Sequence, residues 1–338
     1  MSDFTPAPYE PAERAQLFEL MRHVGRSHID DAEFEWWFER SPARSYVISV
    51  AHADGRLVGM AAMSYFRTLL DGCERIVAVP VHVATDAAFR RRGVFSTLEL
   101  RNERLAGEAG IPLRITFPNA ASHRVFVGDL GWRDLPGRRL WARPLRTAAV
   151  VRYLARRASD AGGMRPAAPH PSHRAGVTVA PLERFDEQTD ALWREAAAGE
   201  NQFVRDATFL NWRYVDSPRD YRRFAAYAGS RLVGFVVMGH TIKHGVSSGF
   251  VADLVTSPDD EAASVALLGR CVDELAPGTD ALVALPARRQ RAGFLRARFL
   301  PTHRRIRFIG KPLQDAAAPA LGARSRAWHF TLGDFDFF

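Results

Sequence analysis

The chain has 338 residues, which is longer than most single domains, so its length predicts two domains. No apolar run is long enough to span a bilayer, and residues 1–10 are acidic and proline-bearing rather than signal-like, so we expect a cytoplasmic protein without a membrane span. The chain has only two cysteines, Cys73 and Cys271, so we expect neither a disulfide framework nor a cysteine-based zinc site.

The net charge of +8 raises the question of a nucleic-acid partner. The basic residues are almost all arginines, since Lys243 and Lys311 are the only lysines, and they are distributed along the chain. They are not interleaved with aromatic residues in one block, so we predict no nucleic-acid partner. Residues 148–157 form a short basic amphipathic segment, which could lie on an anionic membrane surface but more simply packs against a domain.

Residues 11–25 have the apolar spacing of an amphipathic helix, with Leu17, Leu20 and Met21 on one face. Alternating apolar residues from Tyr46 to Val50 predict a strand, and residues 53–55 a turn. A second strand begins at residue 56. These elements lead to residues 79–96, around which we expect the rest of the fold to be organised.

Residues 79–96 predict an anion-binding site. A β-branched strand ends at Thr85, three arginines and Gly93 follow, and a helix is expected over residues 94–109. The unpaired N–H groups of a first helical turn and the helix dipole favour a phosphate, and a glycine lets the backbone approach it closely. The glycine patterns of Walker A loops and dinucleotide folds are absent.

This stretch resembles the acyl-CoA pyrophosphate loop of the GNAT acyltransferase superfamily, written Gln/Arg-x-x-Gly-x-Gly/Ala. Here it reads from Arg90 to Phe95, and Phe95 departs from the pattern. A strand signal over residues 111–117, then Asn119, a short helical segment and Gly131-Trp132 follow in the order of a GNAT core. The resemblance covers residues 79–132 and implies an α/β fold with a mixed sheet.

An ordered internal repeat indicates a tandem duplication. Residues 31–37 recur at 206–212, residues 56–59 at 231–234, and residues 143–145 are echoed at 311–313. The second copy has the acidic segment 257–264 in place of the phosphate loop, and Arg298-Phe299 in place of Gly131-Trp132. We therefore expect two tandem GNAT-like domains, of which only the first binds CoA.

The predicted organisation has four parts. Residues 1–145 form a catalytic GNAT domain, 146–176 a basic helix and Pro/Gly-rich linker, 177–315 a degenerate GNAT-like domain, and 316–338 an aromatic tail. His170 and His173 lie in the linker without further metal ligands, so we predict no metal site. The aromatic tail should dock into a groove, since exposing it would be costly.

The resemblance implies that acetyl-CoA or another acyl-CoA is the cosubstrate and that an amine attacks the thioester directly. The strand from Pro80 to Thr85 would hold the pantetheine arm. The implied cofactor-binding residues are Val83, Ala84, Thr85, Arg90, Arg91, Arg92, Gly93, Val94, Phe95, Ser96, Asn119 and Ser122.

Several side chains are candidates for proton transfer. His82 lies on the implied pantetheine strand and suits proton acceptance at neutral pH, although a structural histidine is the plainer alternative. Asp334, Asp336 and the terminal carboxylate of Phe338 are further candidate bases, or else solvated turn residues. Asp253 is a candidate for orienting substrate. Phe126 stands where the family often has a tyrosine acid, so the general acid stays open.

The leading hypothesis is an acyl-CoA-dependent N-acyltransferase, of acetyltransferase type, acting on the amine of a small metabolite such as an amino sugar or amino-acid derivative. One alternative is an aminoacyl-tRNA-dependent transferase acting on cell-wall precursors, which shares the duplicated fold. Another is a non-catalytic acyl-CoA sensor. The sequence leaves the acceptor, the acyl group and the oligomeric state open.

Overall fold

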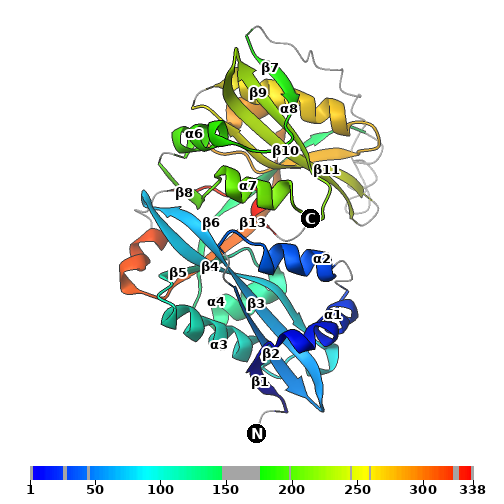
Figure 1. Ribbon diagram of the computed structural model, residues 1–338, viewed down its shortest axis with the longest axis vertical. Coiled ribbons are helices and arrows are strands. Elements are labelled where there is room, and N and C mark those ends of the chain that lie inside the picture. The colour runs from blue at the N-terminus through cyan, green and yellow to red at the C-terminus, as the bar shows by residue number, and fades with distance from the viewer. Residues whose placement is uncertain are drawn as a thin grey trace. The chain divides into compact units, whose positions relative to one another are not determined.

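A computed structural model of the protein describes residues 3–25, 29–43, 46–146, 176–197, 199–243, 246–258, 260–322 and 327–335. These residues form two compact units (Figure 1). Unit 1 comprises Met1–Gly137, Gly199–Val204 and Arg307–Trp328, and unit 2 comprises Arg138–Ala198, Arg205–Ile306 and His329–Phe338. The segment predicted to be a basic helix, the linker histidines His170 and His173, and the candidates Asp336 and Phe338 lie outside the described residues.

The first half of the chain has its elements in the expected order. They are β1 (Thr5–Pro8), α1 (Arg14–His23), α2 (Asp31–Phe34), β2 (Tyr46–Ala53), β3 (Arg56–Leu70), β4 (Cys73–Thr85), α3 (Val94–Glu108), β5 (Leu113–Thr116), α4 (Ala120–Gly128) and β6 (Arg133–Pro144).

The second half repeats this order with one additional short strand near each end. Its elements are β7 (Thr178–Pro181), α6 (Glu187–Ala196), β8 (Glu200–Phe203), α7 (Ala207–Tyr214), β9 (Arg222–Ala228), β10 (Arg231–Lys243), β11 (Val246–Thr256), α8 (Glu261–Leu275), β12 (Ala281–Ala284), α9 (Arg291–Arg296), β13 (Leu300–Pro312) and β14 (Ala327–Trp328).

Unit 1 is built on a mixed sheet in the order β1-β2-β3-β4-β5-β13, where β13 contributes its last residues. β4 and β5 are parallel, and the other neighbours are antiparallel. Helices lie on both sides of this sheet (Figure 1). A Cβ on Gly59 would lie 2.4 Å from the Val94 side chain, so β3 needs a glycine where α3 crosses it.

Unit 2 has the same architecture, with the order β6-β12-β11-β10-β9-β7 and the first residues of β13 beside β6. β11 and β12 are parallel, as β4 and β5 are in unit 1. α8 packs against β9, β10 and β11 and buries an apolar face that includes Leu267, Leu268 and Val272. The predicted mixed α/β class is therefore confirmed in both units.

The two sequence repeats exchange their last strands. Ile309–Pro312 of the second repeat pairs antiparallel with β5 in unit 1. Trp141–Pro144 of the first repeat pairs antiparallel with β12 in unit 2, in the equivalent register. Side-chain contacts repeat as well, because Lys311 donates to the Leu130 carbonyl at 2.8 Å and Arg143 to that of Ala297 at 2.9 Å. Neither sheet is therefore completed by its own repeat.

This exchange predicts that residues 1–137 do not fold by themselves. Without β13 the edge of β5 is unpaired, and Ile309, which is fully buried beside Phe126 and Trp132, is lost from the core. We expect the fragment to show no cooperative unfolding transition by circular dichroism in urea. Appending residues 307–322 through a flexible Gly/Ser linker should restore one. A cooperative transition in the unextended fragment would show that the exchanged strand is dispensable.

Candidate functional site

The strand register places a β-bulge at His82. Met60 pairs with Ala84 and Ala62 pairs with Val81, so β4 has one residue more than β3 over this stretch. His82 has a φ of 47° and is 3 % exposed. Histidine is one of the few residue types besides glycine that is enriched in this left-handed region. The bulge therefore interrupts the regular β3–β4 pairing at His82, the histidine predicted to accept a proton.

β4 and β5 separate just before the bulge. Their ladder contains the pair Ala78 and Arg114, and the Thr116 hydroxyl donates to the Pro80 carbonyl at 3.2 Å. Within the described residues no strand pairs with the β5-facing edge of β4 beyond that point. Val83, Ala84 and Thr85, which the resemblance implies would hold the pantetheine arm, thus lie on a strand that is splayed away from β5.

Aromatic side chains enclose His82 in unit 1. The rings of Trp37 and Phe38 lie 5.3 Å and 5.6 Å from the imidazole. Trp37 is itself fixed because its indole N–H donates to the Ser64 hydroxyl at 2.9 Å. The helical turns after α2 therefore supply a rigid wall beside the bulge, and catalysis by His82 stays a prediction.

The predicted phosphate loop opens helix α3. Gly93 precedes the helix with a φ of 85°, and the first helical hydrogen bond runs from the Thr97 N–H to the Gly93 carbonyl at 2.9 Å. The N–H groups of Val94, Phe95 and Ser96 come before that bond and point out of the helix end. Gly93 is exposed, and a Cβ there would contact nothing within 4 Å. Conformation rather than space requires the glycine.

The three arginines of this loop have different surroundings. Arg92 donates to Asp3 at 2.8 Å and lies over the Phe89 ring, and Arg90 donates to the Thr85 carbonyl at 3.4 Å. Arg91 is exposed and has a left-handed backbone with a φ of 63°. The sequence could not distinguish the three, because the distinction depends on contacts with the N-terminus and the end of β4.

Asn119 and Ser122 lie at the start of α4. The Asn119 side chain accepts hydrogen bonds from the N–H groups of Ala121 and Ser122 at 2.9 Å and 3.0 Å, which makes it a helix N-cap. Phe126 is buried, with Phe95 and Trp132 centred 5.2 Å and 4.7 Å away. Phe95, which departs from the family's loop pattern, therefore packs α3 against Phe126 of α4.

The second repeat has an aspartate at the position of His82. Leu254, Val255 and Thr256 correspond to Val83, Ala84 and Thr85, so Asp253 corresponds to His82. β11 also has a bulge here, because Val237 pairs with Asp253 and Met238 with Val251. Asp253 is 1 % exposed. Unit 2 therefore keeps the splayed strand with a different side chain at its centre.

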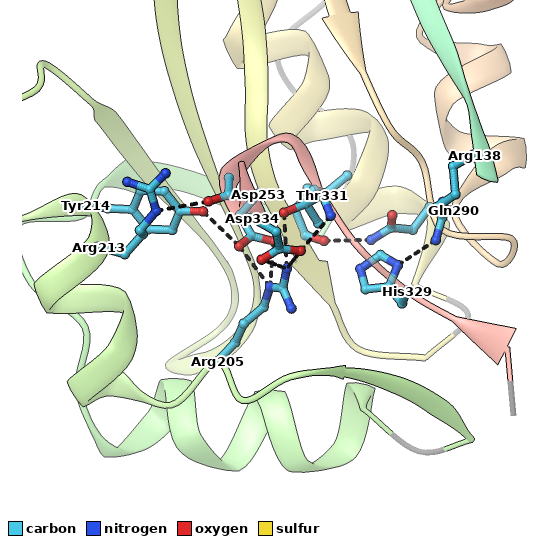
Figure 2. A network of polar contacts seen from close by, with 11 residues as sticks. Arg138, Arg205, Arg213, Tyr214, Asp253, Gln290, His329, Thr331 and Asp334 are labelled. Carbon is cyan, nitrogen blue, oxygen red and sulfur yellow. Dashed lines mark hydrogen bonds and ion pairs between the residues drawn. The ribbon is translucent and has the colours of Figure 1, made fainter. Parts of the chain in front are cut away.

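Asp253 belongs to a buried ionic network (Figure 2). Arg205 Nε lies 3.0 Å and 2.9 Å from the two carboxylate oxygens of Asp253, and Arg205 Nη2 lies 2.8 Å and 2.7 Å from those of Asp334. The Tyr214 hydroxyl donates to Asp253 at 3.0 Å. Burial by itself lowers the pKa of Arg205, but the two carboxylates outweigh it and hold that pKa above its ordinary value.

The same network fixes the described part of the C-terminal tail within unit 2, because Asp334 belongs to that tail. Arg213 donates to the carbonyls of Gly333 and Phe335 at 2.9 Å each. A Cβ on Gly333 would come within 1.8 Å of the Tyr214 hydroxyl, so only glycine fits there. The side chain of Asp334 is 1 % exposed. Its assignment as a catalytic base stays a prediction.

In unit 2 a glutamine side chain bonds the backbone of β11 where that strand separates from β12. The parallel ladder of β11 and β12 ends at the pair Phe250 and Val283. Beyond it, the Gln290 amide donates to the Leu254 carbonyl at 2.7 Å and accepts from the Ala287 N–H at 2.9 Å. The backbone group equivalent to the predicted pantetheine site is therefore bonded within the unit.

The helix start equivalent to the phosphate loop also differs. Asp260 precedes α8 where Gly93 precedes α3, and its carboxylate accepts from the Ala263 N–H at 2.8 Å. A carboxylate at this position already bonds one of the N–H groups that a phosphate would use, and it repels anions. The sequence missed Arg205, Tyr214 and Gln290. The sequence repeat aligns Asp253 with His82, and this buried aspartate could have prompted a search for Arg205 and Tyr214 as its partners.

His329 closes the network at its other end. Arg138 donates to His329 Nδ1 at 3.0 Å, so this nitrogen is the acceptor and the imidazole is neutral. Burial, and then the positive charge of Arg138, hold the pKa of His329 well below its ordinary value. Figure 2 shows this contact beside the Arg205 cluster.

Comparison with known proteins gives a family match over part of the chain and a shared fold over most of it. Residues 7–134 match the family model described as an acetyltransferase (GNAT) domain. The crystal structure of a GCN5-related N-acetyltransferase from Anabaena variabilis has a TM-score of 0.62 at 12 % identity, over 93 % of this chain and 74 % of that one. N-myristoyltransferase from Saccharomyces cerevisiae with bound myristoyl-CoA has a TM-score of 0.65 at 13 % identity, over 92 % and 79 %. No curated protein sequence matches the chain.

The chain contains a GNAT acetyltransferase domain over residues 7–134, and this match supports an acyltransferase. At these identities the structural likenesses concern the fold, and they extend over both units because more than nine-tenths of the chain is covered. The tandem GNAT-like fold predicted from the sequence repeat is confirmed. None of the helices in the described ranges combines the length and apolar character needed to cross a bilayer.

His329 makes stability depend on pH in a defined direction. Its pKa is lower in the folded state than the value of about 6.5 expected in the unfolded chain, so protons favour unfolding. Stability should fall as the pH drops below about 6.5, by up to about 1.4 kcal/mol per pH unit from this residue. Urea titrations of His329→Gln should show a flatter dependence between about pH 7 and pH 5. The exposed His303→Gln serves as the control; equal slopes in all three proteins would contradict the assignment.

Proposed function

We propose that this protein transfers an acyl group from acyl-CoA, with acetyl-CoA as the expected donor, to the amine of a small metabolite such as an amino sugar or amino-acid derivative. The observation that carries the proposal is the succession in unit 1 of the His82 bulge, the splayed end of β4 and the glycine-led start of α3. These features fall within the region that matches the GNAT family model.

The donor site would use the two ends of this segment. The pyrophosphate would bind the N–H groups of Val94, Phe95 and Ser96, and Arg91 is exposed beside them. The pantetheine arm would lie along Val83 to Thr85, where β4 has no strand partner on its β5 side. Backbone N–H groups at the bulge would then polarise the thioester carbonyl.

The reaction would proceed by direct attack. The amine nitrogen forms a bond to the thioester carbon, the carbon–sulfur bond breaks with its electron pair on sulfur, and the amine loses a proton. His82 is the proposed acceptor of that proton because it lies at the bulge, enclosed by Trp37 and Phe38. Phe126 has no proton to give to the thiolate, so water or another group would supply it.

Only unit 1 would bind the donor. In unit 2 Gln290 bonds the Leu254 carbonyl, Arg205 and Asp334 surround Asp253, and Asp260 caps the helix start. Each group that would contact acyl-CoA in unit 1 thus has an internal counterpart in unit 2. The tail remains a candidate contributor to the acceptor site through Asp334, Asp336 and Phe338, the last two of which lie outside the described residues.

Gly93→Val tests the pyrophosphate site. Valine is strained at a φ of 85° and should distort the N–H groups of the first turn, so acetyl-CoA affinity measured by calorimetry should fall by at least about tenfold. Gly110→Val is the matched control, because Gly110 follows the other end of α3, has a φ of 73° and also has no neighbour within 4 Å of a Cβ. Equal affinities of the two variants, or two CoA sites per chain, would contradict the proposal.

His82→Asn tests the proton acceptor. Asparagine tolerates the left-handed backbone but accepts no proton from the amine, so we expect kcat to fall by about 10²- to 10⁴-fold with donor affinity unchanged. The acidic limb of the pH–rate profile should disappear with it. An unchanged rate and profile would exclude His82. If the natural protein binds acetyl-CoA but acetylates no member of an amine panel, the sensor alternative replaces the enzyme.

A further inference from the structure

Unit 2 carries an arginine-rich segment that its counterpart in unit 1 lacks. Residues 286–305 contain seven arginines and no acidic residue, namely Arg288, Arg289, Arg291, Arg296, Arg298, Arg304 and Arg305. The equivalent residues 118–137 contain two arginines and two aspartates. Each segment follows the short strand of the parallel ladder, β5 or β12, and leads through a short helix to the last strand of its repeat. The fold itself therefore does not require this charge.

The exposed residues of α9 and its flanking turns include both arginines and apolar side chains. Gly293 and Phe294 are the buried residues of the helix. Arg291, Leu295 and Arg296 are exposed and fall on the opposite arc at 100° per residue. Leu295 is 51 % exposed, and Leu300, which begins β13, is 56 % exposed. The exposed surface of this segment thus combines guanidinium groups with two large aliphatic side chains.

Little within the protein neutralises this face. Among the exposed arginines from 288 to 298, Arg296 is the one with an ion pair in the described part of the chain, to Glu261 at 2.6 Å. Arg298 has a φ of 61°, at the turn where the first repeat has Gly131 with a φ of 71°. An arginine is kept where a glycine would be unstrained. A side chain that costs backbone strain and points to water suggests a partner outside the chain.

We propose that this face, defined as Arg288–Leu300, binds the surface of an anionic lipid bilayer. Guanidinium groups bond phosphate oxygens in pairs, and their aliphatic stems tolerate the apolar boundary. The exposed leucines would enter that boundary between the arginines, which is the pattern of an interfacial rather than a spanning segment. A nucleic acid would use the arginines but offers no apolar phase for Leu295 and Leu300. The proposal is independent of the acyl-transfer reaction.

Vesicle co-sedimentation of the full-length protein tests this interaction. Binding is expected to vesicles of phosphatidylserine and phosphatidylcholine and not to phosphatidylcholine alone. It should weaken when salt rises from about 0.1 M to about 1 M, since the Debye length falls from about 10 Å to about 3 Å. Arg291→Glu with Arg298→Glu should lower the partition coefficient by at least about tenfold.

The control variant is Arg22→Glu with Arg194→Glu, which changes net charge equally at exposed helix ends outside Arg288–Leu300. It should keep most of the binding, and equal losses in both double variants would reduce the effect to net charge and overturn the proposal. Leu295→Ser separates the partner classes. It should weaken vesicle binding while leaving any gel-shift of single-stranded RNA unchanged. RNA binding that depends on Arg291 and Arg298, without vesicle binding, would assign the face to nucleic acid instead.

Discussion

The exchange of last strands is the constraint on which the rest of the structure depends. β5 and β12 each pair with a parallel strand of their own repeat on one edge only. The other edge, if unpaired, would expose backbone donors and acceptors. In each unit that edge is covered by a strand from the other sequence repeat. The second repeat therefore has a structural role in unit 1 that does not depend on a phosphate loop of its own.

A buried ionic network around Arg205 distinguishes the second repeat from the first. Arg205 is fully buried between Asp253 and Asp334, and the cost of removing these charges from water is offset by four short contacts and the Tyr214 hydroxyl. Removing one member would leave the others uncompensated at a cost of about 3–5 kcal/mol. Asp334 comes from the tail, so the network also orders the last described residues. The splayed strand of unit 2 is therefore bonded to groups from within the same unit.

The two repeats share one fold and differ in their side chains at three equivalent places. The start of α3 is open and glycine-led, whereas the start of α8 is capped by Asp260. The bulge holds His82 among aromatic rings in unit 1 and Asp253 against Arg205 in unit 2. The segment after the short parallel strand is neutral in one repeat and strongly basic in the other. Because the backbone is shared, these differences report on chemistry rather than on folding.

The sequence by itself determined the features that depend on nearby residues. The 3.6-residue period gave α1 and α3, alternation gave β5, and Gly93 between arginines and a helix located the loop, because each signal lies within a few residues. The ordered repeat also predicted two GNAT-like folds. Tertiary structure alone decided which strand completes each sheet, since β6 and β13 have matching patterns and either suits either edge. It also decided the role of Arg205, whose partners lie 48 and 129 residues away, a separation that no local pattern encodes.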